Sequence, residues 1–188
     1  MKDEIESVIK EYFLSEDGQQ RRKKKVTSQA HLGEWGHLIE QMKRAMREYP
    51  VQDFTNLEND WCCIAEILLH KGEKSFLDDD KELVNHLGGN KRSLSVFASL
   101  LTPYYYYYIS EMQYDYHTDK YSFQYCQPTE LELEEVVLPV KSLLEANGYH
   151  QLSNQEARAV ISGVKTECLE EGEVTVFHCL FSELFSPH

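Results

Sequence analysis

Apolar side chains recur every three or four residues over Asp3–Leu14 and again over Trp35–Met46. This spacing places them on one side of a helix, so the sequence predicts two amphipathic helices, the second closing before Pro50. Between them, Arg21–Lys25 is a run of five basic residues. Such a run is usually a solvated loop or a helix end, and we expect a flexible basic loop within residues 15–30.

Two apolar segments fit either a helix or a buried strand. In residues 57–70, Trp61, Ile64 and Leu68 have helical spacing, and this favours a helix over the alternative strand. In residues 173–181, the β-branched residues of the first half favour a central strand. The alternative for this second segment is a helix capped at Thr175.

Short helices are predicted on both sides of the Gly88-Gly89 pair. Asp78–Asp80 is expected to cap the first, which runs through Leu83 and Leu87. The second is expected to start at Asn90, with apolar residues on one side, and to end before Pro103.

Proline and glycine positions divide the region after residue 128. An interior proline costs about 3 kcal/mol, so Pro139 argues against one helix spanning 129–146. We therefore expect an extended piece or a separate helical turn over 130–137, followed by a helix that starts at Pro139. Ser153 opens a capping box, which predicts a further short helix.

The stretch Pro103–Pro128 contains nine of the twelve tyrosines. Its polar and apolar residues alternate on both sides of His117–Lys120, a pattern typical of a β-hairpin. The expected pairs are Tyr116 with Tyr121, Tyr114 with Phe123 and Met112 with Tyr125. Each such aromatic pair contributes roughly 0.2–1 kcal/mol.

These elements predict a helix-rich α+β fold in one domain over residues 1–188. A chain of 188 residues with 41% hydrophobic residues is long enough to bury a core, and it shows no internal repeat or linker. The core is expected to form where a Tyr-rich antiparallel hairpin or small sheet packs against amphipathic helices.

The net charge of −13 changes the expected partners. Residues 130–188 alone contain eleven glutamates and three basic residues, a net charge of −8. Nucleic acid repels such a surface, so we expect no nucleic-acid binding. The excess of acid is either a solubilising surface or a face that attracts a basic partner.

Cysteine usage and the amino-terminal sequence indicate a compartment. Five cysteines, with Cys62 and Cys63 adjacent, suit no ordinary disulfide framework, and reduced thiols in the cytoplasm are expected. The first thirteen residues are acidic and amphipathic, unlike a secretory signal. No apolar run approaches the roughly 18 residues that would indicate a membrane span, so no membrane association is expected.

Motifs for catalysis or metal binding are absent from the sequence. The eight histidines form no HExxH, and neither CxxC nor GxSxG occurs. The glycines before Asn90 lack P-loop spacing and are explained as helix caps. We therefore predict no catalytic residue, metal or cofactor.

The candidate binding residues are Tyr105, Tyr107, Glu111 and Asp115, which share one side of the predicted strand. An aromatic and acidic side of this kind predicts a non-enzymatic protein-binding module for a basic protein partner. Inhibitor or immunity proteins that neutralise toxins have this charge and size, an analogy of composition alone. The alternatives are a small enzyme acting on a small polar substrate near the hairpin, and a subunit of a larger assembly.

Overall fold

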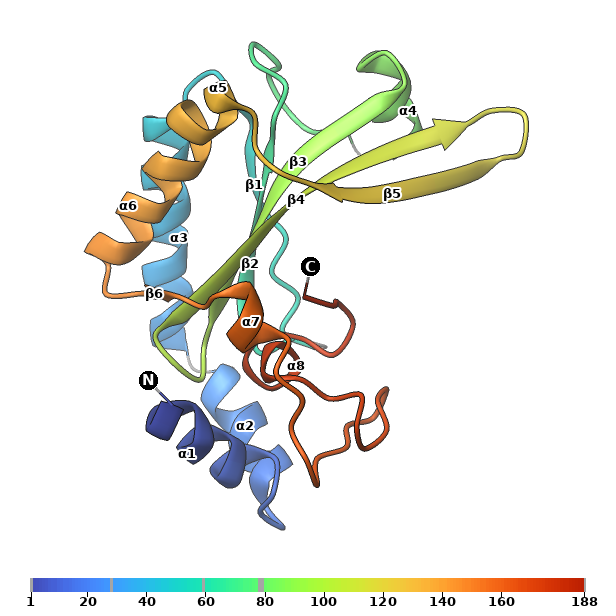
Figure 1. Ribbon diagram of the computed structural model, residues 1–188. Helices are drawn as coiled ribbons and strands as arrows, with labels where there is room; N and C mark the ends of the chain where they lie inside the picture. Colours follow the sequence, from blue (N-terminus) through green and yellow to red (C-terminus); the bar gives the residue numbers. More distant parts are fainter. Residues whose placement is uncertain (1, 28, 59, 78–79, 188) are drawn as a thin grey trace.

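The computed structural model describes residues 2–27, 29–58, 60–77 and 80–187, and it confirms a mixed α+β fold (Figure 1). Five antiparallel strands follow one another across the sheet in sequence order: β1 Val51–Asp53, β2 Cys62–Leu68, β3 Asn90–Ser99, β4 Tyr104–Asp115 and β5 Lys120–Cys126. A short parallel strand, β6 His150–Gln151, pairs with the start of β4. Strand β5 is therefore an edge of the sheet.

Helices and the C-terminal region cover the two sides of the sheet. On one side lie α3 Gln29–Ala45 and α6 Leu138–Ala146 (Figure 1). On the other side, rings of β3 and β4 pack against α8 Val176–Leu180, with Phe97 and Tyr106 5.5 and 5.3 Å from Phe177. Farther along β4, α4 Asp80–His86 packs on this second side, where Val84 meets Met112 and Tyr114. The central strands are thus buried on both sides.

The two expected amino-terminal helices form as α1 Lys2–Tyr12 and α3. The basic run, expected in a loop, instead lies in α2 Gly18–Val26. Its Gln, Arg and Lys residues have straight side chains that lose little freedom in a helix. Val26 is buried and Arg22 stacks on the rings of Phe13 and Trp61, so packing adds to this propensity.

The helices expected over 57–70 and from Asn90 are wrong, because these segments form β2 and β3. The two strands pair along their length, from Cys62 with Ser99 to Leu68 with Ser93. A strand that is buried on both sides has no polar alternation, so its apolar residues also fit a helical stripe.

The break expected at Pro139 does not occur. Helix α5 Glu130–Glu132, the π-helix η1 Leu133–Val137 and α6 follow one another without interruption. The N–H of Leu138 donates to the carbonyl of Leu133, five residues back. In a regular α-helix the Pro139 ring would meet the carbonyl of residue 135, and the wider turn accommodates it.

In the C-terminal region, capping decides the structure. The strand expected over 173–181 is wrong, because Thr175 caps helix α8 through a capping box with His178. The other predicted capping box is confirmed, and Ser153 starts α7 Asn154–Ala157. Helix α4 also forms, but Asp78 and Asp79, two of its three expected capping residues, lie outside the described residues.

Strands β4 and β5 pair across a four-residue turn, residues 116–119. The observed pairs are Tyr114 with Tyr121 and Met112 with Phe123, which is two residues away from the expected register. The turn starts one residue earlier than expected, and Asp119 adopts a left-handed φ of 53° to close it. Because side chains alternate with a period of two, the shift leaves each residue on its expected side.

All five cysteines are free thiols, and Cys62, Cys63 and Cys179 are buried. Burial raises the pKa of the Cys63 and Cys179 thiols to about 12. Within the described residues, no helix has the length and apolar character needed to cross a membrane.

Candidate functional site

Two of the four candidate binding residues belong to the core. Tyr105 has no exposed surface, and its hydroxyl donates to Glu145 Oε1 of α6 at 3.4 Å. Tyr107 is half-buried on the same side of the sheet. Burial raises the pKa of both hydroxyls. The expected aromatic surface on this side of β4 therefore needs correction, because Tyr105 is buried against α6 and Tyr107 is half-buried.

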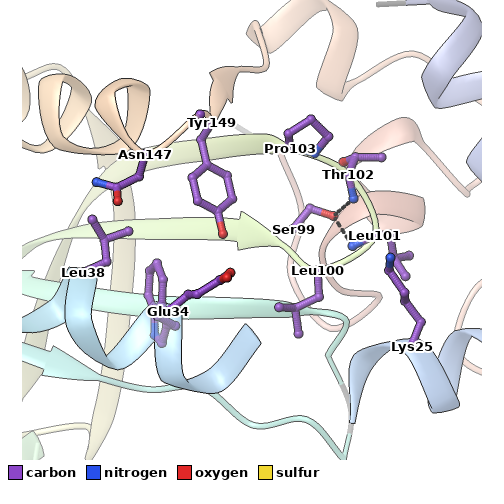
Figure 2. Close-up of a pocket in the computed structure, with 12 residues that line it drawn as sticks. Lys25, Glu34, Leu38, Ser99, Leu100, Leu101, Thr102, Pro103, Asn147 and Tyr149 are labelled. Carbon is purple, nitrogen blue, oxygen red and sulfur yellow. Dashed lines mark hydrogen bonds between the residues drawn. The ribbon is translucent and has the colours of Figure 1, made fainter. Parts of the chain in front are cut away.

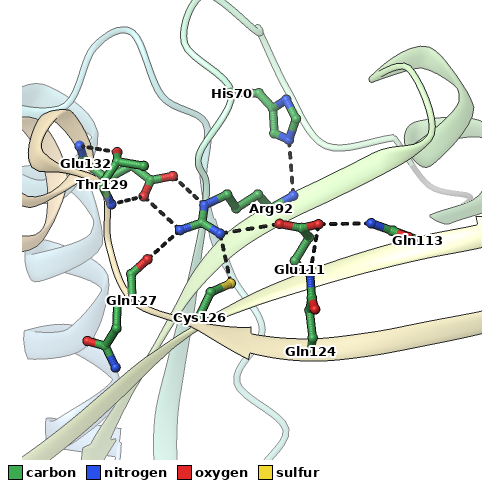
Figure 3. A network of polar contacts seen from close by, with 9 residues as sticks. All are labelled: His70, Arg92, Glu111, Gln113, Gln124, Cys126, Gln127, Thr129 and Glu132. Carbon is green, nitrogen blue, oxygen red and sulfur yellow. Dashed lines mark hydrogen bonds and ion pairs between the residues drawn. The ribbon is translucent and has the colours of Figure 1, made fainter.

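Glu111 lies within a polar network centred on Arg92 (Figure 3). The Arg92 guanidinium donates to both oxygens of Glu132, at 2.6 and 3.0 Å, and approaches Glu111 Oε2 at 3.4 Å. It also contacts Cys126 Sγ at 2.8 Å and the Gln127 carbonyl at 2.7 Å. With its side chain 16% exposed, Glu111 is largely occupied in holding the strands together.

The Arg92 network fixes the base of the hairpin to the rest of the fold. The backbone N–H of Arg92 donates to His70 Nε2, so Nε2 of this histidine carries no proton. Burial lowers the pKa of the His70 imidazole. Glu132 also accepts from the N–H of Thr129 at 2.7 Å. Burial raises the pKa of Glu132, but the bonds from Arg92 and Thr129 outweigh it and hold the pKa below its usual value. Strands β3, β4 and β5 and the start of α5 thus meet at one guanidinium, and the segment after β2 is joined to them through the Arg92 backbone.

Asp115 is the one exposed member of the candidate set, and it lies where β4 enters the turn. Its carboxylate accepts from the Thr118 hydroxyl and from the His117 N–H, both at 2.8 Å. These two bonds lower the pKa of Asp115. Asp115 therefore shapes the turn while keeping its negative charge at the surface.

The exposed aromatic residues of the hairpin lie on the opposite side from Glu111. Four side chains, which we term the aromatic row, have exposed fractions of 52%, 42%, 65% and 47%: Tyr116, Tyr121, Phe123 and Tyr125. They occupy the turn and alternate positions of β5. The sequence carried a signal for them in the alternation with Ser122 and Gln124, but the acidic residues of β4 directed the prediction to the other side.

Two rings of β4, Tyr108 and Tyr114, pack against three members of the aromatic row. The Tyr125 ring lies 5.1 Å from Tyr108, and the Tyr121 and Tyr116 rings lie 4.9 and 4.6 Å from Tyr114. The pairs of Tyr125 with Tyr108 and of Tyr116 with Tyr114 are edge-to-face, an arrangement that aromatic rings prefer. Tyr116, Tyr121 and Tyr125 therefore pack against rings of the chain itself, whereas Phe123 is the most exposed of the four.

One cation of the chain already binds at this end of the hairpin. Lys81 of α4 lies with its Nζ 4.4 Å above the Tyr114 ring and 3.0 Å from Asp119 Oδ1. Tyr114 donates its hydroxyl to the same carboxylate. Hydrogen bonds with Tyr114 and Asp119 raise the pKa of Lys81. The combination of a ring face and a carboxylate near the turn is thus suited to an ammonium group.

A pocket of about 510 Å³ lies at the other end of β4, beside the turn between β3 and β4 (Figure 2). Its polar groups include Lys25, Glu34 and the hydroxyl of Tyr149, whose pKa is raised by burial. The amides of Leu101 and Thr102, which also line it, donate to Ser99 Oγ at 3.2 and 3.3 Å. The lining of this pocket thus includes one basic and one acidic side chain.

Two further pockets have volumes of about 290 and 540 Å³, the smaller beside Arg22 and Trp61 and the larger beside Arg47 and Tyr49. No histidine or cysteine lines any of these three pockets. In the part of the chain that the structure describes, no three His, Cys, Asp or Glu side chains are grouped to hold a metal ion.

Comparison of the chain with protein-family models, with curated proteins and with solved structures found no match. The arrangement of the residues is therefore the only ground for assigning a function. Within that arrangement, the aromatic row brings four exposed rings together on one hairpin.

Proposed function

We propose that this chain is a non-enzymatic protein-binding module that engages a basic protein through the aromatic row. The observation that carries the proposal is the exposure of four adjacent large rings on one hairpin. Isolated exposed apolar residues are normal on a protein surface, but adjacent ones mark interaction sites. Tyrosine is also enriched among the residues that dominate binding energy at interfaces.

Charge supports a basic partner. The chain has a net charge of −13, which attracts positively charged proteins over long distances and speeds their encounter. At short range, the face of a tyrosine or phenylalanine ring attracts lysine or arginine by about 0.5–1 kcal/mol at an exposed site. The contact of Lys81 with Tyr114 and Asp119 shows the same chemistry within the chain.

Geometry favours this proposal over the alternative of a small enzyme. An enzyme site near the hairpin would need a concave pocket with a partnered histidine or cysteine. The 510 Å³ pocket instead lies beside Pro103, at the end of β4 far from the turn, and its lining contains neither residue type. An inhibitor-like role, in which the module neutralises a basic protein, is consistent with the charge of the chain.

The proposal is tested by capturing partners from a lysate of the source cell on the tagged chain at low and high salt. The test variant is Phe123→Ala combined with Tyr125→Ala. The matched control is Leu131→Ala combined with Val160→Ala, because these side chains are 53% and 56% exposed and lie outside the hairpin. We expect the wild type and the control to retain one stoichiometric basic protein that high salt releases, and the test variant to lose it.

Two results would overturn the proposal. One is retention of the same protein by the Phe123→Ala/Tyr125→Ala variant. The other is a captured partner whose amount does not change with salt, because binding driven by opposite charges weakens as salt screens them.

A further inference from the structure

We infer that the basic partner binds as an extended segment that pairs with the outer edge of β5, the last strand in the order of the described sheet, and continues the sheet. This inference rests on the proposed function and adds the mode of binding. Strand β5 is hydrogen-bonded to β4 on one side and ends the strand order of the described sheet. Residues 120–125 are all exposed. The outer N–H and C=O groups of β5 therefore form a template for another strand.

The edge has few of the features by which proteins usually protect such a template. Natural edge strands carry prolines, bulges or several charges that prevent pairing with another chain. The strand has no proline, and its one charged residue is Lys120 at its first position. Its pairing with β4 runs without a bulge over seven residue pairs, from Asp115 with Lys120 to Ile109 with Cys126. Seven residues span about 23 Å, enough for a stable strand contact.

The side chains of β5 specify the sequence pattern of the segment. Tyr121, Phe123 and Tyr125 stand about 7 Å apart along one side of the strand, because alternate residues share a side. A paired segment would place its own alternate residues beside these rings, where lysine or arginine gains a cation–π contact. On the other side it would meet Ser122 and Gln124, which suit small polar residues. The expected ligand is therefore an extended segment with a basic residue at every second position.

A second copy of the chain is a less suitable occupant of the edge. Pairing of β5 with β5 would bring together two chains that each carry a net charge of −13. Like charges across an interface are unfavourable, whereas a basic segment neutralises part of the acidic field. Sedimentation of the free chain is expected to show a monomer, and a dimer with β5 amides protected from hydrogen exchange would overturn the inference.

The decisive experiment uses synthetic eight-residue peptides in which lysine alternates with threonine. One peptide is unmodified. A second carries a methyl group on the backbone amide nitrogen of every lysine, and a third carries it on the backbone amide nitrogen of every threonine. In an extended chain, alternate N–H groups point to the same side, so only one of the two methylated sets removes the donors that pair with β5. The acidic control peptide alternates glutamate with threonine.

We expect the unmodified peptide to bind, to slow hydrogen exchange of β5 amides, and to lose at least about tenfold in affinity when one of the two sets is methylated. Equal binding of all three lysine peptides would overturn strand pairing and leave the proposed function standing, because the side-chain contacts would then suffice. Failure of every lysine peptide to bind at millimolar concentration, or equal binding of the glutamate peptide, would overturn both.

Discussion

Arg92 is the residue on which the anchoring of the hairpin depends most. Its side chain is 16% exposed and that of Glu132 is 10% exposed. Removing one partner of a buried ion pair leaves the other charge uncompensated and costs about 3–5 kcal/mol. We expect Arg92→Met to lower the free energy of unfolding in urea by about 3 kcal/mol.

The control for this prediction is Lys43→Met, which breaks the exposed pair with Glu40. Exposed pairs of this kind contribute about 0.5 kcal/mol or less. An Arg92→Met protein as stable as the Lys43→Met protein would show that the network does not hold the hairpin.

Glu132 makes the same network sensitive to acid. Its pKa in the folded chain lies below the ordinary value of 4.5, so its bonds stabilise the fold fully above the unfolded pKa. That contribution is lost as the pH falls through the folded-state pKa. We expect the stability difference between wild type and Glu132→Gln to be constant from pH 7 to about pH 5.5 and to shrink below it. Urea denaturation of both proteins across this pH range measures the stability difference. A difference that is unchanged at pH 3 would contradict the prediction.

Tyr105 and Phe123 are predicted to respond in opposite ways to the same kind of substitution. Tyr105 is buried, so Tyr105→Ala is expected to cost about 3 kcal/mol or more of stability. Phe123 is 65% exposed, so Phe123→Ala is expected to cost less than about 1 kcal/mol while it weakens partner binding. Urea denaturation and partner capture measure the two effects. If the Tyr105→Ala protein is stable but no longer captures the partner, Tyr105 belongs to the binding surface after all.

At the level of elements, the start of α5 is coupled to the Arg92 network. Thr129 Oγ accepts from the Glu132 N–H, while the Thr129 N–H donates to the carboxylate that Arg92 also binds. Loss of an ordinary N-cap costs about 1 kcal/mol, which is the expectation for Ser153→Ala in α7. Thr129→Ala should cost more, and a double-mutant cycle with Arg92→Met should show a coupling of at least about 0.5 kcal/mol. Additive effects in urea would argue against the coupling.

The sequence predicts the surface elements of this fold better than the central ones. Helices α1 and α3 each expose one side to water, so their apolar stripes are visible in the sequence. Strand β3 is covered on both sides, and Leu94, Phe97 and Ala98 happen to have helical spacing. Only the neighbouring strands, which lie far away in sequence, decide that this segment is extended.

The same limit applies to the binding surface. Alternation within the hairpin correctly separates Tyr105 and Tyr107 from Tyr121 and Phe123. It does not indicate which side a helix will cover, because that depends on how α6 packs. The continuous helix through Pro139 is a similar case. Helix propensity predicts a break at an interior proline, but the wider turn of η1 removes the clash between the proline ring and the preceding carbonyl.

For the whole molecule, the net charge of −13 predicts how binding depends on salt. Long-range attraction acts mainly on the association rate, and the screening length falls to about 10 Å at 0.1 M salt. We expect the association rate of the captured partner to fall steeply between about 20 and 300 mM salt. The dissociation rate should change less, because ring contacts are short-ranged. Stopped-flow mixing measures both rates, and an effect confined to dissociation would contradict the prediction.

The length of the four-residue turn also determines which side of the hairpin carries the exposed aromatic rings. Removing Thr118 would move β5 by one residue against β4 and turn Tyr121, Phe123 and Tyr125 to the side of Glu111. The deletion leaves the net charge and every aromatic residue in place. A one-residue deletion in this turn would thus move the binding surface to the other side of the hairpin, without substitution of any aromatic residue.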